Sequence, residues 1–132
     1  MYIRPYSHED FEMITSWWEA AGECPPVRGM MVEDGTFIMT LDNIPALTVT
    51  VFLTQSKEMA YAEGFIKNPI FNHMELEDEA QHLANHAYAY ARDRGYSRLI
   101  AYCNNKKLTE KYIRLGLQLS AENLFSVVRK LG

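Results

Sequence analysis

The stretch ARDRGYSRLIAY, residues 91–102, joins the end of one predicted element to the start of another. Gly95 stands where a helix commonly ends, and the compact apolar run SRLIAYC after it predicts a strand. The helix that leads into this stretch carries apolar residues three and four positions apart along one face, which is the signal of an amphipathic helix. That face consists of Leu76, Ala80, Leu83, Ala84, Ala87 and Ala91.

The first twenty-two residues predict a short strand followed by a helix. Ser7 is a natural N-cap, and Asp10 stands three residues later in the capping-box position. Gly22 is the expected stop. The apolar stripe that should face the core consists of Phe11, Ile14, Trp18 and Ala21. Met13 and Trp17 lie off this stripe, where they line a pocket, make a subunit contact or belong to a broadly buried helix.

A long connection and three strands come next. Residues 23–35 have weak periodicity, so we expect a loop, and loops of this length in compact domains are often functional. Asp42–Pro45 and Ser56–Lys57 are plausible turns, and Gly64 suggests a bulge or a close backbone approach. The three strands, rich in β-branched and aromatic residues, are TFIMTL (36–41), ALTVTVFLT (46–54) and EMAYAEGFI (58–66).

The end of the chain adds a helix over KKLTEKYIRLG (106–116), stopped by Gly116, and a last strand over LFSVVRK (124–130). The chain contains no repeat, low-complexity stretch or linker. The order strand–helix–strand–strand–strand–helix–strand–helix–strand predicts one domain over residues 1–132. Its expected class is α+β (α/β-type), with a mixed, mostly antiparallel sheet and helices on both faces.

Composition narrows the classes of function. The chain has 132 residues, of which 48% are hydrophobic and 23% charged, the balance of a folded domain. A formal net charge of −4 without a basic run argues against a nucleic-acid binder. The two cysteines, Cys24 and Cys103, lie far apart and outside metal-ligand spacing. We expect neither a membrane segment nor a signal peptide, and a reducing cytoplasmic setting.

Two polar patterns lie on the helix over residues 76–94. Four acidic residues mark its start, namely Glu75, Glu77, Asp78 and Glu79. Acids are favourable at a helix start, but that position is also suited to a phosphate. His82 and His86 are four residues apart and could share a zinc ion. They lie opposite the apolar stripe with no third ligand at motif spacing, so no metal is expected.

The element order, with ARDRGYSRLIAY and NKKLTEKYIRLGL (105–117), resembles the GNAT fold of the GCN5-related N-acetyltransferases over essentially the whole chain. The most specific part is Asn105, then Tyr112 seven residues later, then Gly116. The resemblance implies that Asn105 touches the pantetheine arm or fixes the helix start. It also implies that Tyr112, protonated at neutral pH, is the general acid for the departing CoA thiolate. The alternatives are a capping Asn105 and a Tyr112 that packs on the sheet.

The strand over YAEGFIKNP (61–69) stands where the family's fourth strand separates from its neighbour to admit the pantetheine arm. The resemblance therefore implies that Phe65 and Ile66 bind the cofactor. Glu63 sits where some members keep a carboxylate that removes a proton from the substrate amine. A solvent-facing strand residue is the alternative. The spacing from here to Pro69 is about one residue longer than is usual in the family.

The start of the next helix departs from the family pattern. Members carry Q/R-x-x-G-x-G/A there, and its backbone N–H groups hold the CoA pyrophosphate. Glu75 replaces the basic or amide residue, Asp78 replaces the first glycine, and Ala80 is an acceptable last position. A carboxylate about 6 Å from a phosphate oxygen costs about 3 kcal/mol at an effective dielectric of about 20. The resemblance thus implies retained chemistry with a weakened cofactor anchor.

The function implied by the resemblance is transfer of an acetyl group from acetyl-CoA to a primary amine. The altered helix start favours an alternative, a non-catalytic GNAT-fold module with a binding or structural role. Small phage-encoded GNAT-like proteins, some of them virion-associated, are similar in this respect and in the segments FIKNP and RDRGY. A third alternative is an acyl donor that lacks the pyrophosphate. The expected partners are acyl-CoA and an amine, with a homodimer or a virion assembly as further associations.

Overall fold

The computed structural model describes residues 1–103 and 106–120. Contacts within the chain divide it into two units, Met1–Tyr102 and Cys103–Gly132, each of which is described by itself. The strand expected over residues 124–130 lies outside the described residues. One domain spanning residues 1–132 stays a prediction.

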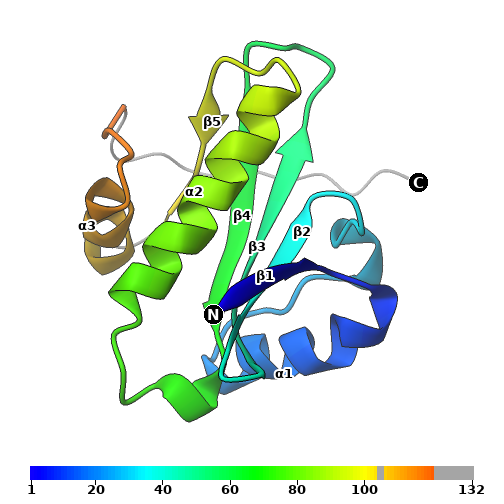
Figure 1. The fold of residues 1–132 in the computed structure, drawn as a ribbon, viewed down its shortest axis with the longest axis vertical. Helices are drawn as coiled ribbons and strands as arrows, with labels where there is room; N and C mark the ends of the chain where they lie inside the picture. Colours follow the sequence, from blue (N-terminus) through cyan, green and yellow to red (C-terminus); the bar gives the residue numbers. More distant parts are fainter. Residues whose placement is uncertain (104–105, 121–132) are drawn as a thin grey trace. The chain divides into compact units, whose positions relative to one another are not determined.

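The first unit is built on a five-stranded sheet in the order β1-β2-β3-β4-β5 (Figure 1). Neighbouring strands are antiparallel from β1 to β4, whereas β4 and β5 are parallel. This pattern confirms the expected mixed, mostly antiparallel sheet of the α+β class. The strands are β1 (Tyr2–Pro5), β2 (Thr36–Leu41), β3 (Ile44–Leu53), β4 (Ala60–Lys67) and β5 (Leu99–Ile100).

The β2–β3 hairpin turns at Asp42 and Asn43, where a turn was expected. Both residues have positive φ angles, 51° and 64°. Two consecutive left-handed residues make the primed turn whose twist matches that of the flanking strands. Asp and Asn tolerate this conformation better than most residues, which is why the chain can turn here without glycine.

Two helices, α1 (Phe11–Ala20) and α2 (Glu77–Asp93), cover opposite faces of the sheet. The Phe37 ring on β2 lies 5.1 Å from the ring of Tyr90 on α2, measured between centroids. The next residue, Ile38, belongs instead to a buried cluster with Ile14 of α1. Successive strand residues point to opposite faces, so the two helices must lie on different sides. Helices on both faces are therefore confirmed.

The expected apolar face of α2 is buried, from Ala80 to Ala91, and Leu83 is fully buried. The helix ends as expected at Gly95, whose φ is 89°. The Gly95 N–H donates to the Arg92 carbonyl at 2.9 Å, and the Tyr96 N–H donates to the Ala91 carbonyl at 3.2 Å. These two bonds form a Schellman motif, which satisfies carbonyls at the end of the helix.

The buried face of α1 agrees with the prediction in part. Trp17 is only 3% exposed, whereas Trp18 is half-buried and Ala21 is exposed. Ile14 and Trp17, one turn apart, are the fully buried pair of this helix. Trp18 lies at the side of that face, where it covers β4 at Gly64. Phe11 and Trp18 of the expected stripe pack against the buried cluster that contains Ile14, so the stripe was wrong only at Ala21. The burial of Trp17 agrees with the alternative of a broadly buried helix.

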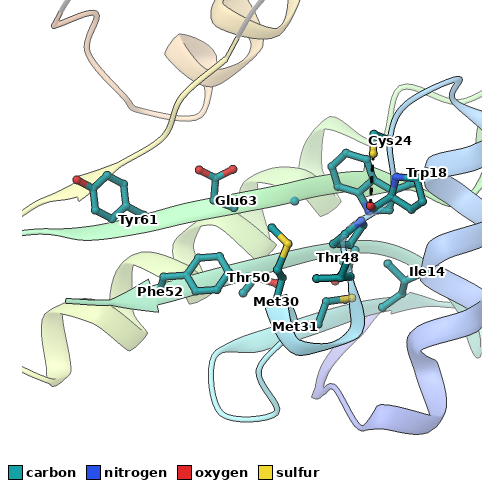
Figure 2. Close-up of a pocket in the computed structure, with 14 residues that line it drawn as sticks. Ile14, Trp18, Cys24, Met30, Met31, Thr48, Thr50, Phe52, Tyr61 and Glu63 are labelled. Atoms are coloured by element: carbon teal, nitrogen blue, oxygen red, sulfur yellow. Dashed lines mark hydrogen bonds between the residues drawn. The ribbon is translucent and has the colours of Figure 1, made fainter. Parts of the chain in front are cut away.

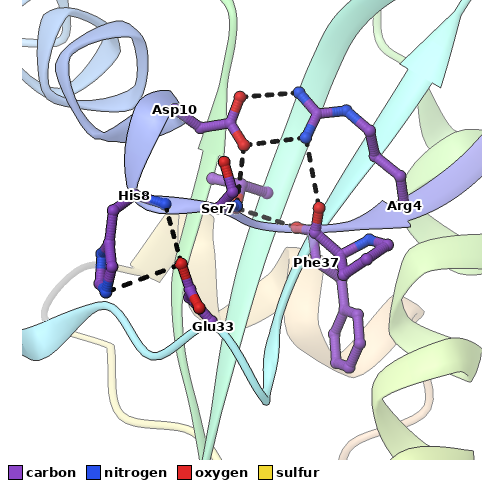
Figure 3. A network of polar contacts seen from close by, with 8 residues as sticks. Arg4, Ser7, His8, Asp10, Glu33 and Phe37 are labelled. Atoms are coloured by element: carbon purple, nitrogen blue, oxygen red, sulfur yellow. Dashed lines mark hydrogen bonds and ion pairs between the residues drawn. The ribbon is translucent and has the colours of Figure 1, made fainter.

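An ion pair joins β1 to the start of α1 (Figure 3). The Asp10 carboxylate accepts two hydrogen bonds from the Arg4 guanidinium, both at 2.8 Å, and one from the Ser7 backbone N–H at 3.0 Å. The Ser7–Asp10 bond is the expected capping-box contact. Nearby, the His8 backbone N–H donates to Glu33 at 3.3 Å, which ties the connection over residues 23–35 to this corner.

In the second unit, α3 (Lys106–Arg114) ends at Gly116 as predicted. Gly116 has a φ of 99°, and the Leu117 N–H donates to the Tyr112 carbonyl at 3.1 Å. Tyr112 and Leu115 are buried. In the part of the chain that the structure describes, no helix is both long enough and apolar enough to cross a bilayer.

Candidate functional site

Strand β4 is irregular at its centre. Thr50 of β3 pairs with Glu63, whereas Thr48 pairs with Ile66, so two residues of β4 oppose one residue of β3. The extra residue forms a β-bulge at Gly64, whose φ is 72°. A bulge bends its strand and re-aims the neighbouring side chains. The predicted bulge at Gly64 is confirmed.

The ladder between β4 and β5 consists of two pairs, Ala60 with Leu99 and Tyr61 with Ile100. β4 continues to Lys67, whereas the strand expected over residues 97–103 is limited to Leu99–Ile100. The expected length was wrong because a strand extends only as far as a partner backbone runs beside it. The β4–β5 pairing thus ends just before Glu63 and the bulge.

A cavity of about 680 Å³ lies on the α1 face of the sheet (Figure 2). Strands β3 and β4 form its floor, α1 forms one wall, and the connection over residues 23–35 forms another. This connection, predicted as a functional loop, contains one short 3-10 turn, Arg28–Met30. The lining residues are Ile14, Trp18, Cys24, Pro25, Pro26, Val27, Met30, Met31, Thr48, Thr50, Phe52, Tyr61, Glu63 and Gly64.

Glu63 is the charged group of this cavity. Among the described lining residues there is no second acid, and no lysine or arginine. Glu63 is an exposed residue, as the alternative of a solvent-facing strand residue requires, and its apolar neighbours raise the pKa of this carboxyl above its ordinary value by partial desolvation. A carboxylate with a raised pKa is better matched to accepting a proton from an amine than an ordinary surface acid.

Aromatic side chains lie beside Glu63 along the floor. Phe52 and Tyr61 are a cross-strand pair, one pair away from Thr50 and Glu63 on the same face. The Tyr61 ring is also stacked on Tyr102, with centroids 5.8 Å apart and an interplanar angle of 19°. Tyr102 raises the pKa of the Tyr61 hydroxyl. On the other side of Glu63, Trp18 covers Gly64 (Figure 2).

The residues predicted from the sequence fall into three places. Glu63, Phe65 and Ile66 lie together on β4, where Glu63 and Ile66 share the α1 face through their pairing with Thr50 and Thr48. Ala80 is buried in the first turn of α2, and its N–H donates to the Leu76 carbonyl at 2.9 Å. Tyr112 is buried on α3 in the second unit, and Asn105 lies outside the described residues. The roles of all these residues stay predictions.

The start of α2 carries the acids predicted there. Glu77, Asp78 and Glu79 occupy its first turn, and Leu76 before them is left-handed, with φ of 50° and ψ of 38°. A bulky residue rarely adopts this conformation, and here its side chain is buried at 5% exposure. The Lys67 ammonium donates to the Met74 carbonyl at 2.7 Å, so one cation lies beside this acidic segment.

Several lining residues were not predicted as site residues, among them Trp18, Met30, Phe52 and Tyr61. Met30 could have been predicted from its place in the connection over residues 23–35, whose length indicated a functional loop. Phe52 and Tyr61 alternate correctly for one strand face, but only the pairing of β3 with β4 brings them together. Trp17 was considered for a pocket, whereas its neighbour Trp18 lines it.

His82 and His86 of α2 were considered as metal ligands in the sequence. The His86 ring lies 4.5 Å from the Phe37 ring, centroid to centroid, and burial together with His82 lowers the His86 pKa. Within residues 1–103 and 106–120, no three His, Cys, Asp or Glu side chains are grouped so that they could hold a metal ion.

Of the comparisons with known proteins, the one with solved structures found similar proteins. No protein-family model matches the chain, and no curated protein sequence matches it. Among solved structures, the protein TTHA1254 from Thermus thermophilus is similar with a TM-score of 0.66 and 18% identity. That match covers 100% of this chain and 98% of the other.

Two similar structures are acetyl-transfer enzymes solved with coenzyme A or an analogue. N-acetylglutamate synthase from Neisseria gonorrhoeae, complexed with coenzyme A and N-acetyl-glutamate, has a TM-score of 0.73 and 19% identity, over 92% of this chain but 29% of its own. The aminoglycoside N-acetyltransferase AAC(6')-Iy, in complex with a CoA-linked bisubstrate analogue, has a TM-score of 0.69 and 14% identity over 98% of both chains. At these identities the likeness establishes the fold, which is that of the GNAT acetyltransferases.

Proposed function

We propose that this chain is an acyl-CoA-dependent N-acetyltransferase of the GNAT type that transfers an acetyl group to a primary amine. Glu63 carries the proposal, because it is the one acid that lines an otherwise apolar cavity, its pKa is raised although the residue is exposed, and it lies next to the place where the β4–β5 ladder ends. The similar enzymes solved with coenzyme A or a CoA-linked analogue support acetyl-CoA as the co-substrate.

The chemistry needs one base and one acid. Glu63 accepts a proton from the bound ammonium, directly or through one water. The neutral nitrogen attacks the thioester carbon, so that a C–N bond forms as the C–S bond breaks. The departing sulfur takes up a proton, and the family resemblance assigns its donor as Tyr112. Once the C–N bond has formed, the nitrogen loses a second proton, which restores the Tyr112 hydroxyl through solvent, and Glu63 returns its own proton to solvent. The products are the N-acetylated amine, free CoA thiol and one released proton, so that atoms and charges balance.

The acyl end and the diphosphate end of the co-substrate meet different surroundings. Phe65 and Ile66, on β4 beyond the ladder with β5, would contact the pantetheine arm. At the start of α2, the exposed carboxylates of Glu75 and Asp78 oppose a diphosphate. Because these side chains can turn toward water, they weaken binding rather than exclude it. Lys67 supplies a compensating charge nearby.

The direct test is calorimetric titration of the whole chain with acetyl-CoA and with CoA. We expect binding heat for both, and no heat at millimolar ligand would contradict the proposal. Release of the CoA thiol then measures turnover across a panel of primary amines.

Variants separate the two proposed roles. Glu63→Gln should lower kcat/KM by about 10²–10⁴-fold, the usual size of a general-base effect. Glu12→Gln, the same change at an exposed position of α1, should have no effect. Tyr112→Phe should lower kcat while CoA binding is retained. Turnover unchanged in Glu63→Gln would remove the proposed base.

The acidic start of α2 favours a second candidate, a non-catalytic GNAT-fold module with a binding or structural role, such as a phage accessory or virion-associated protein. This candidate predicts no binding heat with CoA and unchanged biological activity in Tyr112→Phe. A donor without a pyrophosphate would be found by a ligand screen of acyl thioesters. We expect a cytoplasmic protein in the first case, and a homodimer or virion assembly is compatible with either.

A further inference from the structure

We infer that the cavity on the α1 face binds a primary monoamine whose body is apolar and aromatic, rather than a polyamine or an aminosugar. The part of this inference that concerns turnover rests on the proposed function. The part that concerns binding stands on the cavity alone.

The charge of the cavity matches one ammonium group. Glu63 is the one acid among the described lining residues, and no lysine or arginine is present to pair with a ligand carboxylate or phosphate. A second ammonium would find no second carboxylate among these residues. The rings of Trp18 and Phe52 attract a cation, but this attraction is smaller than the cost of removing an unpaired charge from water. Polyamines are therefore disfavoured, and acidic ligands still more.

The walls match an apolar body of limited length. Phe52 and Tyr61 lie one cross-strand pair from Glu63 on the same face, and one pair on a shared face corresponds to roughly 7 Å along a strand. An amine held at Glu63 thus reaches aromatic surface after two or three carbon atoms. Trp18 closes the other side, over Gly64, so the ligand body meets a ring in either direction.

The rim and the size agree with this ligand class. Val27 and Met30 are 65% and 53% exposed, an apolar edge that a polar ligand would not use. Methionine adapts its shape to different apolar partners. A volume of about 680 Å³ lies within the usual range for small-molecule sites and is ample for a single-ring amine.

The test uses the whole chain without acetyl-CoA and three probes at pH 8: 2-phenylethylamine, its neutral counterpart 2-phenylethanol, and spermidine. Calorimetry should give a Kd for 2-phenylethylamine at least tenfold below that of either other probe. Equal or tighter binding of spermidine would overturn the inference, as would the absence of binding by 2-phenylethylamine.

Two variants assign the binding to this cavity. Glu63→Gln should remove the preference for the amine, so that the Kd values of 2-phenylethylamine and 2-phenylethanol lie within about threefold of each other. Met30→Lys places a cation at the rim and should weaken the amine at least fivefold while the alcohol is unaffected. Ile44→Lys is an equally large change at an exposed apolar residue of the β2–β3 hairpin, and it should leave the affinities for the amine and for the alcohol unchanged. A preference for the amine that persists in Glu63→Gln would overturn the assignment.

Turnover with acetyl-CoA separates this inference from the proposed function. If 2-phenylethylamine binds as described but no CoA thiol is released with any amine, the proposed function fails and the ligand class stands. If spermidine is acetylated and 2-phenylethylamine is not, the ligand class fails and the proposed function stands.

Discussion

The Glu63 carboxyl lies between water and the apolar wall of the cavity. This position favours the protonated form in the folded chain, whereas binding of an amine needs the ionised form. The raised pKa of Glu63 means that the fold favours the protonated form. The stabilisation that this form contributes is complete below the ordinary carboxyl pKa and is lost as pH rises through the raised value. The ionised form that binds an amine is thus the one that the fold tolerates less well.

A stability measurement therefore checks the environment of Glu63 without any ligand. Glu63→Gln should raise the melting temperature at pH 8, where the native carboxylate is ionised, and change it less at pH 4. Thermal unfolding at the two pH values measures the difference. A variant that is less stable at pH 8 than the parent chain would mean that the carboxylate is not desolvated.

The pKa of Asp10 is shifted in the opposite direction from that of Glu63. Its hydrogen bonds from Arg4, followed by the bond from Ser7, outweigh burial and hold the pKa of this carboxyl below its usual range. The stabilisation it contributes is present above the unfolded-state pKa and is lost as pH falls through the lowered folded-state value.

Asp10→Asn should lower the free energy of unfolding by about 1–2 kcal/mol at pH 7, because a charge-assisted pair and a cap contact are weakened together. Urea unfolding measures the change. Near pH 2 the difference between the variant and the parent chain should shrink, since Asp10 is then increasingly protonated in both states. Glu12→Gln is the control, and a loss of equal size there would contradict the assignment.

At the scale of elements, β4 derives its shape from one left-handed residue. Gly64 has a φ of 72°, and a Cβ added there would meet only Trp18 Cζ2 at 3.7 Å, an ordinary contact. The cost of Gly64→Ala is thus conformational, about 1–2 kcal/mol for a side chain in the left-handed region. Gly29→Ala is the control, since its Cβ would meet open space and its φ is not left-handed. Urea unfolding should show a loss only for Gly64→Ala, and equal losses would argue against strain at the bulge.

The first turn of α2 combines a benefit to the helix with a cost to a bound diphosphate. Asp78→Asn should destabilise the helix by up to about 1 kcal/mol through its dipole. It should also tighten CoA binding by about threefold, because a solvent-screened charge about 6 Å away costs roughly 0.7 kcal/mol. Calorimetry at two salt concentrations measures the effect, which should fade at high salt. Asp93→Asn, at the far end of α2, should leave CoA affinity unchanged, and a gain there would mean that only net charge matters.

At the scale of the whole molecule, the sheet divides two apolar layers. Leu83 of α2 is fully buried on one side, and Ile14 with Ile38 is fully buried on the other. Leu83→Ala should lower the free energy of unfolding by about 2–5 kcal/mol, a large share of the roughly 5–15 kcal/mol that holds a domain of this size. Leu53→Ala, at a residue 38% exposed on β3, should cost much less. Similar losses in urea unfolding would contradict the layer assignment.

The order of the strands and α-helices as far as α3 follows from the sequence by itself. So do the buried face of α2, the stops at Gly95 and Gly116, and the Asp42–Asn43 hairpin. Each depends on neighbours within a few positions: the spacing of apolar residues along a helix, or the few residue types that tolerate a left-handed backbone. Because interactions between neighbouring residues determine these features, they can be predicted from a single sequence.

The cavity was decided only by the tertiary structure. Its lining extends from Ile14 to Gly64 and depends on the packing of α1 and of the connection over residues 23–35 against the sheet, and on the register of β3 against β4. The length of β5 likewise depends on β4 beside it. Register and strand length are set by packing between distant segments, and no local pattern in the chain encodes that packing.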